Sequence, residues 1–371
     1  MAETPVFLFS AMHWLTYISI SREICREDDE RMGGKLRWGV LGTGRILSKA
    51  GPGLQQSGNG VWHGVAGRTP ENGRQAAGMY GVPRAYESYE ALIEDPAIDA
   101  VYIALLNHLH AEWAVKACEA GKHVLVEKPF ALNAREAEQI AAAARRSGVL
   151  VQEAFVWRHH PAYAAIKRLA DAGAVGEWLH FRGHFSFVAG ADSTRWNKAW
   201  GGGALYDVGC YPVSWARFFA GGEPVAADGY AVIDPDRGVD RRFVGALYFA
   251  GGRSAHIEAA MDMPHGSFFE LLGTKGRLSA AFTVTAQELT IRCRIGSEEQ
   301  AWTTDRITPF RVQAERFAEA VFGQSQQHPG ADDAVSQSLA MDALFAAART
   351  GRRCPVGQGE VMRFAGGQNR I

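Results

Sequence analysis

Between Leu36 and Val151 the chain alternates short apolar runs with segments of helix length. Apolar runs this short are typical of buried strands, and parallel strands need a crossover connection that is usually a helix. The regular alternation therefore predicts an α/β fold with a doubly wound parallel sheet. The predicted strands are 36–41, 61–66, 100–106, 124–126 and 149–151, and the predicted helices are 70–80, 111–120 and 134–147.

A glycine turn at residues 42–46 follows the first predicted strand. Gly42 permits a tight turn, and Gly44 lets backbone N–H groups approach a pyrophosphate at the positive end of the next helix. We expect that helix over 48–56, with an interruption near Gly51. A glycine pair alone also suits a plain structural turn, but its place directly after a first strand favours a dinucleotide site.

The end of the second predicted strand bears on the choice of cofactor. NAD-binding sheets usually place an Asp or Glu about 20 residues after the glycine turn, where its carboxylate holds the ribose 2′-hydroxyl and disfavours a 2′-phosphate. No acidic residue occurs between Gly42 and Thr69, and Arg68 follows the strand. A guanidinium suits bidentate contact with a phosphate. We expect NADP, with NAD as the alternative; the competing interpretation is that Arg68 is a solvated loop residue.

Composition excludes several classes of function. The chain has 39 basic and 40 acidic residues and a formal charge of −1, so no basic field is available for nucleic acid or an anionic membrane. Its five cysteines are far apart and form no metal-binding pair. At 371 residues, two domains are expected. We predict a reduced, cytoplasmic protein with no structural metal and no nucleic-acid or membrane partner.

Residues 1–31 differ from the rest of the chain. The stretch 5–20 is largely apolar, but it lacks the basic start of a secretory signal and the length of a membrane-spanning helix. A densely charged run, 22–31, comes next. We predict that residues 1–31 lie outside the fold, and an upstream start codon is one hypothesis for their origin.

The second half of the chain predicts a different kind of sheet. Apolar runs follow one another without long helices between most of them, which favours a large, mostly antiparallel open sheet. Two helices close the chain. The predicted strands are 178–187, 243–249, 254–261, 267–272 and 288–293, and the helices are 311–322 and 331–350.

Three side chains could share the handling of a proton. Asp207 and Tyr211 are four residues apart, so a helix over 207–220 would project both from one face. Lys128 follows the strand 124–126, at the edge where ligands of open α/β sheets bind. Beside a lysine cation a tyrosine ionises more readily, and burial lowers the pKa of a lysine. The alternative is that Asp207 caps the helix and Tyr211 is simply packed.

Six motifs follow one another in a fixed order along the chain. They are Gly42-Thr43-Gly44-Arg45-Ile46, Asn107-His-Leu-His110, Glu127-Lys128-Pro129, Glu153-Ala-Phe-Val-Trp157-Arg158-His-His160-Pro161, Gly201-Gly-Gly-Ala-Leu-Tyr-Asp207-Val-Gly-Cys-Tyr211-Pro212 and Leu271-Leu-Gly-Thr-Lys275-Gly276. In this order the motifs resemble the Gfo/Idh/MocA oxidoreductase family. The resemblance extends from Leu36 to about Val356. Within the family the chain is most similar to the branch of dimeric dihydrodiol dehydrogenases, NADP-dependent xylose dehydrogenases and glucose-fructose oxidoreductase, which carry Tyr where others carry His.

The resemblance implies an organisation into domains. Residues 32–152 would form a Rossmann dinucleotide-binding domain, and 153–308 an α+β domain that binds substrate and makes the oligomer. The free face of the large open sheet would form a homodimer or a higher homo-oligomer. Residues 309–371 would supply helices that pack back on the nucleotide domain.

The resemblance also assigns roles to residues. Tyr211 would be the general acid/base, Lys128 its activating and substrate-orienting partner, and Asp207 an anchor for a substrate hydroxyl. Which of Lys128 and Tyr211 holds the transferred proton stays open. The cofactor would be bound by the residues Gly42, Thr43, Gly44, Arg45, Ile46, Arg68, Leu105, Asn107, His110, Glu127 and Lys128.

The substrate side is expected just after the last strand of the first domain. Trp157, Arg158 and His160 would give an aromatic and hydrogen-bonding platform for a sugar, although His160 also suits a helix start. Arg195 lies in a segment that is long for a simple connection and could close over the substrate.

Together these expectations describe an NADP-dependent dehydrogenase or reductase. It would transfer a hydride between the nicotinamide and a carbinol carbon of a sugar, polyol or cyclic diol. The alternative is a nucleotide-binding sensor or regulator with the same fold and no chemistry. Such a protein would be free to lose Lys128 and Tyr211, and this chain keeps both.

Overall fold

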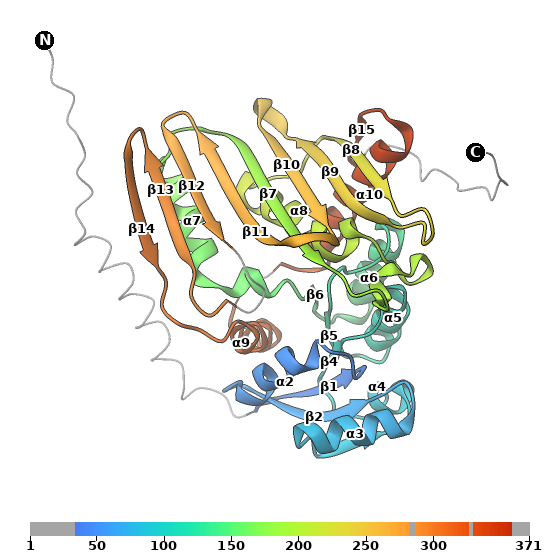
Figure 1. Ribbon diagram of the computed structural model, residues 1–371. Coiled ribbons are helices and arrows are strands. Elements are labelled where there is room, and N and C mark those ends of the chain that lie inside the picture. The colour runs from blue at the N-terminus through green and yellow to red at the C-terminus, as the bar shows by residue number, and fades with distance from the viewer. Residues whose placement is uncertain (1–33, 282–285, 326–328, 358–371) are drawn as a thin grey trace, which may run out of the picture. The chain divides into compact units, whose positions relative to one another are not determined.

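The computed structural model of the protein describes residues 34–281, 286–325 and 329–357. The predicted extension, residues 1–31, therefore lies outside the described residues. Two sheets make up the described part of the chain from Leu36 onward (Figure 1).

The first sheet has six parallel strands in the order β3-β2-β1-β4-β5-β6, which confirms the predicted doubly wound sheet. The one strand that the sequence did not predict, β3, is short and polar. The strands are β1 Leu36–Leu41, β2 Gly60–Ala66, β3 Arg84–Tyr86, β4 Ala100–Ile103, β5 His123–Val126 and β6 Val151–Glu153. The connecting helices are α2 Leu47–Gln56, α3 Pro70–Tyr80, α4 Tyr89–Ile93, α5 His110–Glu119 and α6 Ala134–Ser147.

Helix α2 is continuous, so the expected interruption near Gly51 is wrong. Pro52 lies inside the helix. The small residues around it allow close packing, because a Cβ atom on Gly53 would lie 2.7 Å from Phe310 in helix α9, Pro309–Val321. Gly53 thus allows close contact between helices α2 and α9, and Gly51 does not interrupt α2.

The second sheet has nine strands in the order β14-β13-β12-β11-β7-β10-β9-β8-β15. Only β7 and β10 pair in parallel among the pairs described, so the expected mostly antiparallel sheet is confirmed. The strands are β7 Trp178–Val188, β8 Ala226–Ile233, β9 Asp240–Tyr248, β10 Ser254–Ala260, β11 Asp262–Gly273, β12 Gly276–Ala281, β13 Thr290–Ile295, β14 Glu298–Thr303 and β15 Cys354–Pro355.

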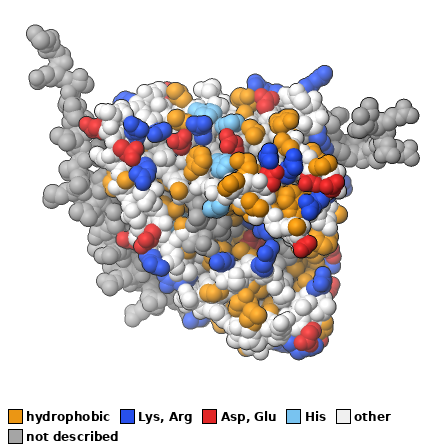
Figure 2. Space-filling model, in the orientation of Figure 1, with side chains coloured by type: hydrophobic (Ala, Val, Ile, Leu, Met, Phe, Trp, Pro, Cys, Tyr) orange, Lys and Arg blue, Asp and Glu red, His pale blue; other side chains and the backbone are white. Residues whose placement is uncertain are grey.

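The two faces of the nine-stranded sheet differ. Helices α7 Pro161–Asp171, α8 Cys210–Ala220 and α10 Ala331–Thr350 cover one face, where the alternate strand residues Phe181 and Phe269 are fully buried (Figure 1). The strand residues between them point the other way. On that open face Phe268 and Val244 are 42% and 41% exposed, and Figure 2 shows apolar and histidine side chains across it.

The closing helices contact both sheets. Helix α9 packs on α2, and α10 packs between α6 and strand β8. No helix in residues 34–281, 286–325 and 329–357 is both long and apolar enough to cross a membrane.

Three connections matter for the site. The loop after β4 contains a turn of 3-10 helix at Asn107–Leu109, and another such turn, Val156–His159, follows β6. We call residues 189–203, between β7 and the helical region of α8, the strap. It contains two short 3-10 turns, Thr194–Trp196 and Lys198–Trp200.

Candidate functional site

Lys128 lies directly after β5, at the carboxyl edge of the six-stranded sheet. Its side chain is 16% exposed and points to the second domain. The ammonium Nζ donates to the backbone oxygen of Asp207 at 2.7 Å and lies 3.1 Å from its Oδ1 atom. The Lys128–Pro129 peptide is cis. The structure thus brings together two residues, far apart in sequence, that were predicted to share a site.

The predicted helix over 207–220 begins differently from expectation. Residues Leu205–Gly209 form a π-helical turn, and α8 starts only at Cys210. π-Helical turns are rare in proteins, but those that occur are often found at functional sites. Asp240 anchors this start, because its Oδ2 accepts from the N–H of Leu205 at 2.7 Å. Burial raises the pKa of Asp240 to about 7, although that hydrogen bond opposes the shift.

Arg195 of the strap also reaches Asp207, with Nε 2.5 Å from Oδ2. Asp207 therefore lies between two cations, Lys128 and Arg195. Burial raises the pKa of Asp207, but the two cations outweigh burial and lower it overall. The carboxylate is held ionised and fixed in direction.

Tyr211 completes the group. It is 4% exposed, and the Nζ of Lys128 lies 5.3 Å from the centroid of its ring. Burial raises the pKa of Tyr211 above its ordinary value, while Lys128 acts in the opposite direction. Burial lowers the pKa of Lys128, but Asp207 and Tyr211 outweigh burial and raise it overall. The expected lowering of the lysine pKa is therefore wrong, because Asp207 pairs with the ammonium. We call Lys128, Arg195, Asp207 and Tyr211 the lysine cluster.

Two residues expected beside the cofactor support the loops instead. His110 is fully buried, with Nδ1 2.8 Å from the Pro129 oxygen and Nε2 3.1 Å from the Leu105 oxygen. It ties the loop after β4 to the turn that carries Lys128. The side-chain amide of Asn107 donates to the Gly201 oxygen of the strap at 2.9 Å. The expectation that these side chains line the cofactor is corrected to that extent.

Glu127 also points into the protein. Its carboxylate accepts from the hydroxyl of Tyr102 in β4 and from the N–H of Lys128 at 3.2 Å. Burial raises the pKa of Glu127, and the bond from Tyr102 opposes this. Its carboxylate therefore supports the Lys128 turn from below rather than facing a cofactor.

The glycine turn has the geometry that a pyrophosphate needs. Gly42 has a φ of +100°, and a Cβ atom there would collide with the Ala104 oxygen and lie 3.1 Å from Leu105. Residues 43–45 are exposed, while Ile46 and Leu105 are partly buried. Within the described residues, no backbone acceptor pairs with the N–H groups of 43–46. These donors, at the start of α2, fit a dinucleotide phosphate.

Arg68 is exposed just beyond the carboxyl end of β2. Thr69 beside it caps α3, since its side chain accepts from the N–H of Asn72. Gly67 packs against that helix start, because a Cβ there would lie 2.6 Å from the nitrogen of Gly73. Arg68 therefore follows β2 on a loop without a carboxylate, and its contact with a 2′-phosphate stays a prediction.

Three residues predicted to bind substrate make other contacts in this structure. Trp157 is 1% exposed and packs against Tyr163, Trp215 and Phe218 in the core of the second domain. His160 is 3% exposed, and its Nδ1 accepts from the N–H of Ala162 at the start of α7. The alternative interpretation of His160, a helix start, is the one the structure shows. The hydrophobic surface of Trp157 is used for packing.

Arg158 is the third residue that was predicted to bind substrate, and its side chain points toward helices α8 and α10. Its Nη2 lies 2.9 Å from Asp333 Oδ2 and 3.3 Å from Ser214 Oγ. Asp333 also pairs with Arg217 at 3.1 Å, and Arg217 donates further to Gln337 at 3.0 Å. Arg158 thus links helices α8 and α10, and its contact with a substrate stays a prediction.

Glu153, at the end of β6, faces the same region. Its Oε1 accepts from the N–H of Phe130 at 2.9 Å, two residues after Lys128. Burial raises the pKa of Glu153 to about 8, and nearby Asp333 adds to the shift while Arg158 and Arg217 oppose it. We call Glu153, Arg158, Arg217 and Asp333 the arginine cluster. Sequence reasoning missed it, because Arg217 and Asp333 stand in no recognisable pattern.

The described residues contain no group of three His, Cys, Asp or Glu side chains that could hold a metal ion.

Comparison with known proteins identifies the family. Residues 36–155 match the model of the oxidoreductase family with an NAD-binding Rossmann fold, and residues 163–279 match the Gfo/Idh/MocA C-terminal domain. A D-xylose 1-dehydrogenase (NADP⁺) from Haloferax volcanii is 35% identical over 325 residues, covering 85% of this chain and 98% of the relative. A trans-1,2-dihydrobenzene-1,2-diol dehydrogenase from Xenopus laevis is 32% identical over 65% of this chain and 73% of the relative.

A solved structure agrees with these relatives. A 3-ketoreductase from Actinomadura kijaniata, in complex with NADP and TDP-benzene, superposes with a TM-score of 0.80 at 28% identity, over 85% of this chain and 98% of that one. Sequence and fold agree over both domains. The chain therefore belongs to the Gfo/Idh/MocA family of oxidoreductases, with an NAD(P)-binding Rossmann domain.

Proposed function

We propose that this protein is an NADP-dependent oxidoreductase that transfers a hydride between the nicotinamide and a carbinol carbon of a sugar, polyol or cyclic diol. The observation that supports it best is the lysine cluster, in which Lys128 Nζ lies 3.1 Å from the Asp207 carboxylate and 5.3 Å from the ring of Tyr211. This is a cation, an anion and a phenol at the carboxyl edge of a nucleotide-binding sheet.

Tyr211 is the proposed general acid and base. Because its pKa is raised, Tyr211 holds its proton and is ready to donate it to a carbonyl oxygen that becomes a hydroxyl. The Lys128 ammonium beside it stabilises the phenolate that remains. In the direction of oxidation the carbinol carbon gives up a hydride, and its hydroxyl proton passes to the phenolate. NADP, when bound, accepts or supplies the hydride.

Asp207 is the proposed anchor of a substrate hydroxyl. Lys128 and Arg195 keep it ionised and fix both of its oxygen atoms in direction. A preformed carboxylate accepts a hydroxyl hydrogen bond with little reorganisation. Arg195 is a substrate contact in this proposal, and the strap that carries it bounds the site.

NADP is the proposed form of the cofactor. The N–H groups at residues 43–46 would hold the pyrophosphate, and Arg68 would contact the 2′-phosphate. The Arg68→Glu variant should weaken NADPH about 100-fold and NADH far less, because the new carboxylate would lie near the phosphate. Equal losses for the two nucleotides, measured by fluorescence titration, would reject the 2′-phosphate role.

The function is tested by following NADPH absorbance with NADP⁺ and, separately, NAD⁺. The substrates are a panel of aldoses, inositols, polyols and cyclic diols, with Tyr211→Phe as the control variant. We expect an NADP⁺-dependent signal for one class of substrate that is lost in the control. Silence across the panel, despite tight NADPH binding, would favour a sensor without chemistry.

A second copy of the chain is the proposed partner. The open face of the nine-stranded sheet exposes Phe268, Val244 and Tyr230, the last of them 69% exposed (Figure 2). A contiguous apolar face is a common interaction surface. Phe268→Glu should shift the protein to a smaller species in size-exclusion chromatography with light scattering, and an unchanged mass would count against this interface.

A further inference from the structure

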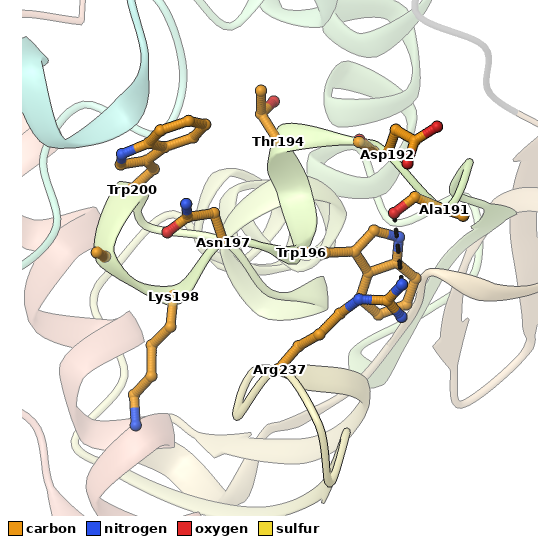
Figure 3. A pocket seen from close by; sticks show the side chains of 10 residues that line it. Ala191, Asp192, Thr194, Trp196, Asn197, Lys198, Trp200 and Arg237 are labelled. Atoms are coloured by element: carbon orange, nitrogen blue, oxygen red, sulfur yellow. Dashed lines mark hydrogen bonds between the residues drawn. The ribbon is translucent and has the colours of Figure 1, made fainter.

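A groove lies along the strap, next to the turn between β8 and β9 (Figure 3). Its volume is about 510 Å³, which is within the range of small-ligand sites. The strap supplies most of the lining, and Arg237 of the turn completes it. The residues that matter below are Asp192, Thr194, Trp196, Asn197, Trp200 and Arg237.

Two indole rings give the groove apolar surfaces in fixed positions. The guanidinium of Arg237 lies 4.8 Å from the centroid of the Trp196 ring, and the indole nitrogen of Trp196 donates to the Gly190 oxygen at 2.9 Å. Trp200 stacks on His108 with a centroid distance of 6.2 Å and an angle of 14°. Figure 3 shows Trp196 and Arg237 at one end of the groove and Trp200 at the other.

The polar groups that line the groove are of mixed kind. Thr194 offers a hydroxyl, Asn197 an amide and Asp192 a carboxylate, and Lys198 and Arg237 are cations. Aromatic faces combined with hydroxyl, amide and charged hydrogen-bonding groups suit the C–H face and the hydroxyls of a neutral sugar ring. A nucleoside diphosphate would meet Lys198 and Arg237 as well as Asp192, so the titration with dTDP-glucose described below distinguishes it from a neutral sugar.

The groove is connected to the lysine cluster through the strap. Arg195 reaches Asp207, while its neighbours Thr194 and Trp196 line the groove. At the other end of the strap, Gly201 accepts from Asn107 of the loop after β4. A ligand that holds the strap in place therefore also holds the position of Arg195 on Asp207.

We propose that this groove is a second carbohydrate subsite, which takes a sugar ring linked to the ring that reacts at Lys128 and Asp207. The preferred substrate would then be a disaccharide or glycoside rather than a free monosaccharide. The proposal rests on the proposed function for the reacting ring. Binding of the second ring contributes to turnover because contacts remote from the reacting carbon can stabilise the transition state.

The first experiment compares kcat/KM for cellobiose, maltose and xylobiose with that for glucose and xylose, using NADP⁺ and the full chain. We expect one disaccharide to exceed its monosaccharide by about 10-fold or more. Trp196→Ala and Arg237→Ala should each remove most of this advantage and affect the disaccharide far more than the monosaccharide. Two variants are used so that misfolding of one does not decide the result.

Arg253→Ala is the matched control. Arg253 lies over the indole of Trp178 at 4.9 Å, the same pairing as Arg237 and Trp196, but it does not line the groove. It should keep the ratio of disaccharide to monosaccharide activity. If the unaltered protein oxidises these sugars but shows no preference for a disaccharide, or if all three variants lose the ratio equally, the subsite is overturned.

A binding measurement separates this proposal from the proposed function. Calorimetric titration of the NADP-loaded protein with the same disaccharides, and with dTDP-glucose, requires no turnover. Disaccharide binding that weakens in Trp196→Ala supports the subsite even if no sugar is oxidised, in which case the proposed function fails alone. Absence of disaccharide binding would overturn the subsite, and so would tighter binding of dTDP-glucose that is lost in Arg237→Ala.

Discussion

The lysine cluster and the arginine cluster both join the six-stranded sheet to the region of α8, yet they use charge in opposite ways. In the lysine cluster one carboxylate, Asp207, lies between Lys128 and Arg195, beside the phenol of Tyr211. In the arginine cluster the guanidinium of Arg217 is 2% exposed and is held by Glu223, Gln337 and Asp333. The first cluster keeps a proton-carrying group next to a cation, and the second fixes helices.

The comparison teaches that buried charge alone does not mark a catalytic site. Both clusters contain residues with shifted pKa values, since structural ion networks perturb pKa values as active sites do. Both clusters begin at the carboxyl ends of strands, but they follow different strands. Lys128 follows the inner strand β5, whereas Glu153 ends the edge strand β6, one strand further from β1 and its glycine turn. The same distinction separates Arg195, which reaches Asp207, from Arg158, which pairs with Asp333.

The largest effect is expected in the lysine cluster. Lys128→Met or Tyr211→Phe should lower turnover by about 10²–10⁴-fold, the usual contribution of a positioned acid/base. NADPH affinity and the unfolding temperature should change little. Steady-state kinetics with the substrate found in the panel measures this, and Lys167→Met on the surface of α7 is the control. Near-normal turnover in both variants would break the assignment of chemistry to this cluster.

A change in the arginine cluster should act on stability instead. Asp333→Asn removes the carboxylate that pairs with Arg158 and one of the two carboxylates that pair with Arg217, which keeps Glu223. The variant should lower the free energy of unfolding by about 1–3 kcal/mol. The turnover number of the folded variant should stay within about 3-fold of normal, since Asp333 lies outside the proposed site. Denaturant titration and kinetics at low temperature measure the two quantities. A large loss of turnover with unchanged stability would show that Asp333 contributes to catalysis rather than to stability, which contradicts the difference proposed between the two clusters.

The smallest effect is a pH dependence. Burial raises the pKa of Glu153 from 4.5 to about 8, so between these values the folded chain holds a proton that the unfolded chain has lost. Stability from this group is present below pH 4.5 and is lost as the pH rises to about 8. Glu153→Gln keeps an acceptor for Phe130 but does not titrate. Its unfolding temperature should therefore rise relative to the unaltered protein across this window, and a constant difference would contradict the shifted pKa.

The sequence predicted most elements of the first sheet because its buried strands are continuous apolar runs. Strand β3 was missed because Arg84–Tyr86 is short and partly polar, and β8 was missed because Gly229 and Asp228 interrupt its apolar pattern. Neither the π-helical turn at Leu205–Gly209 nor the continuous α2 follows from local propensity, since both depend on tertiary contacts.

The candidate site was predicted in part. The motifs predicted that Lys128, Asp207 and Tyr211 share a site, and in the structure Lys128 contacts Asp207. The contact of Arg195 with Asp207 agrees with a site beside the strap. The sequence did not predict the packing of Trp157 or the link that Arg158 makes between helices, because an aromatic ring and a guanidinium serve these roles as readily as sugar binding. Residue type alone does not reveal which way such a side chain points.

A double-mutant cycle on Lys128 and Tyr211 tests the central claim most directly. Residues that act as one catalytic unit show losses that are far from additive. The account predicts that the Lys128→Met/Tyr211→Phe double variant is no slower than the slower single variant, while it still binds NADPH. Losses in turnover that multiply in the double variant would show that the two side chains act independently and would contradict the proposed mechanism.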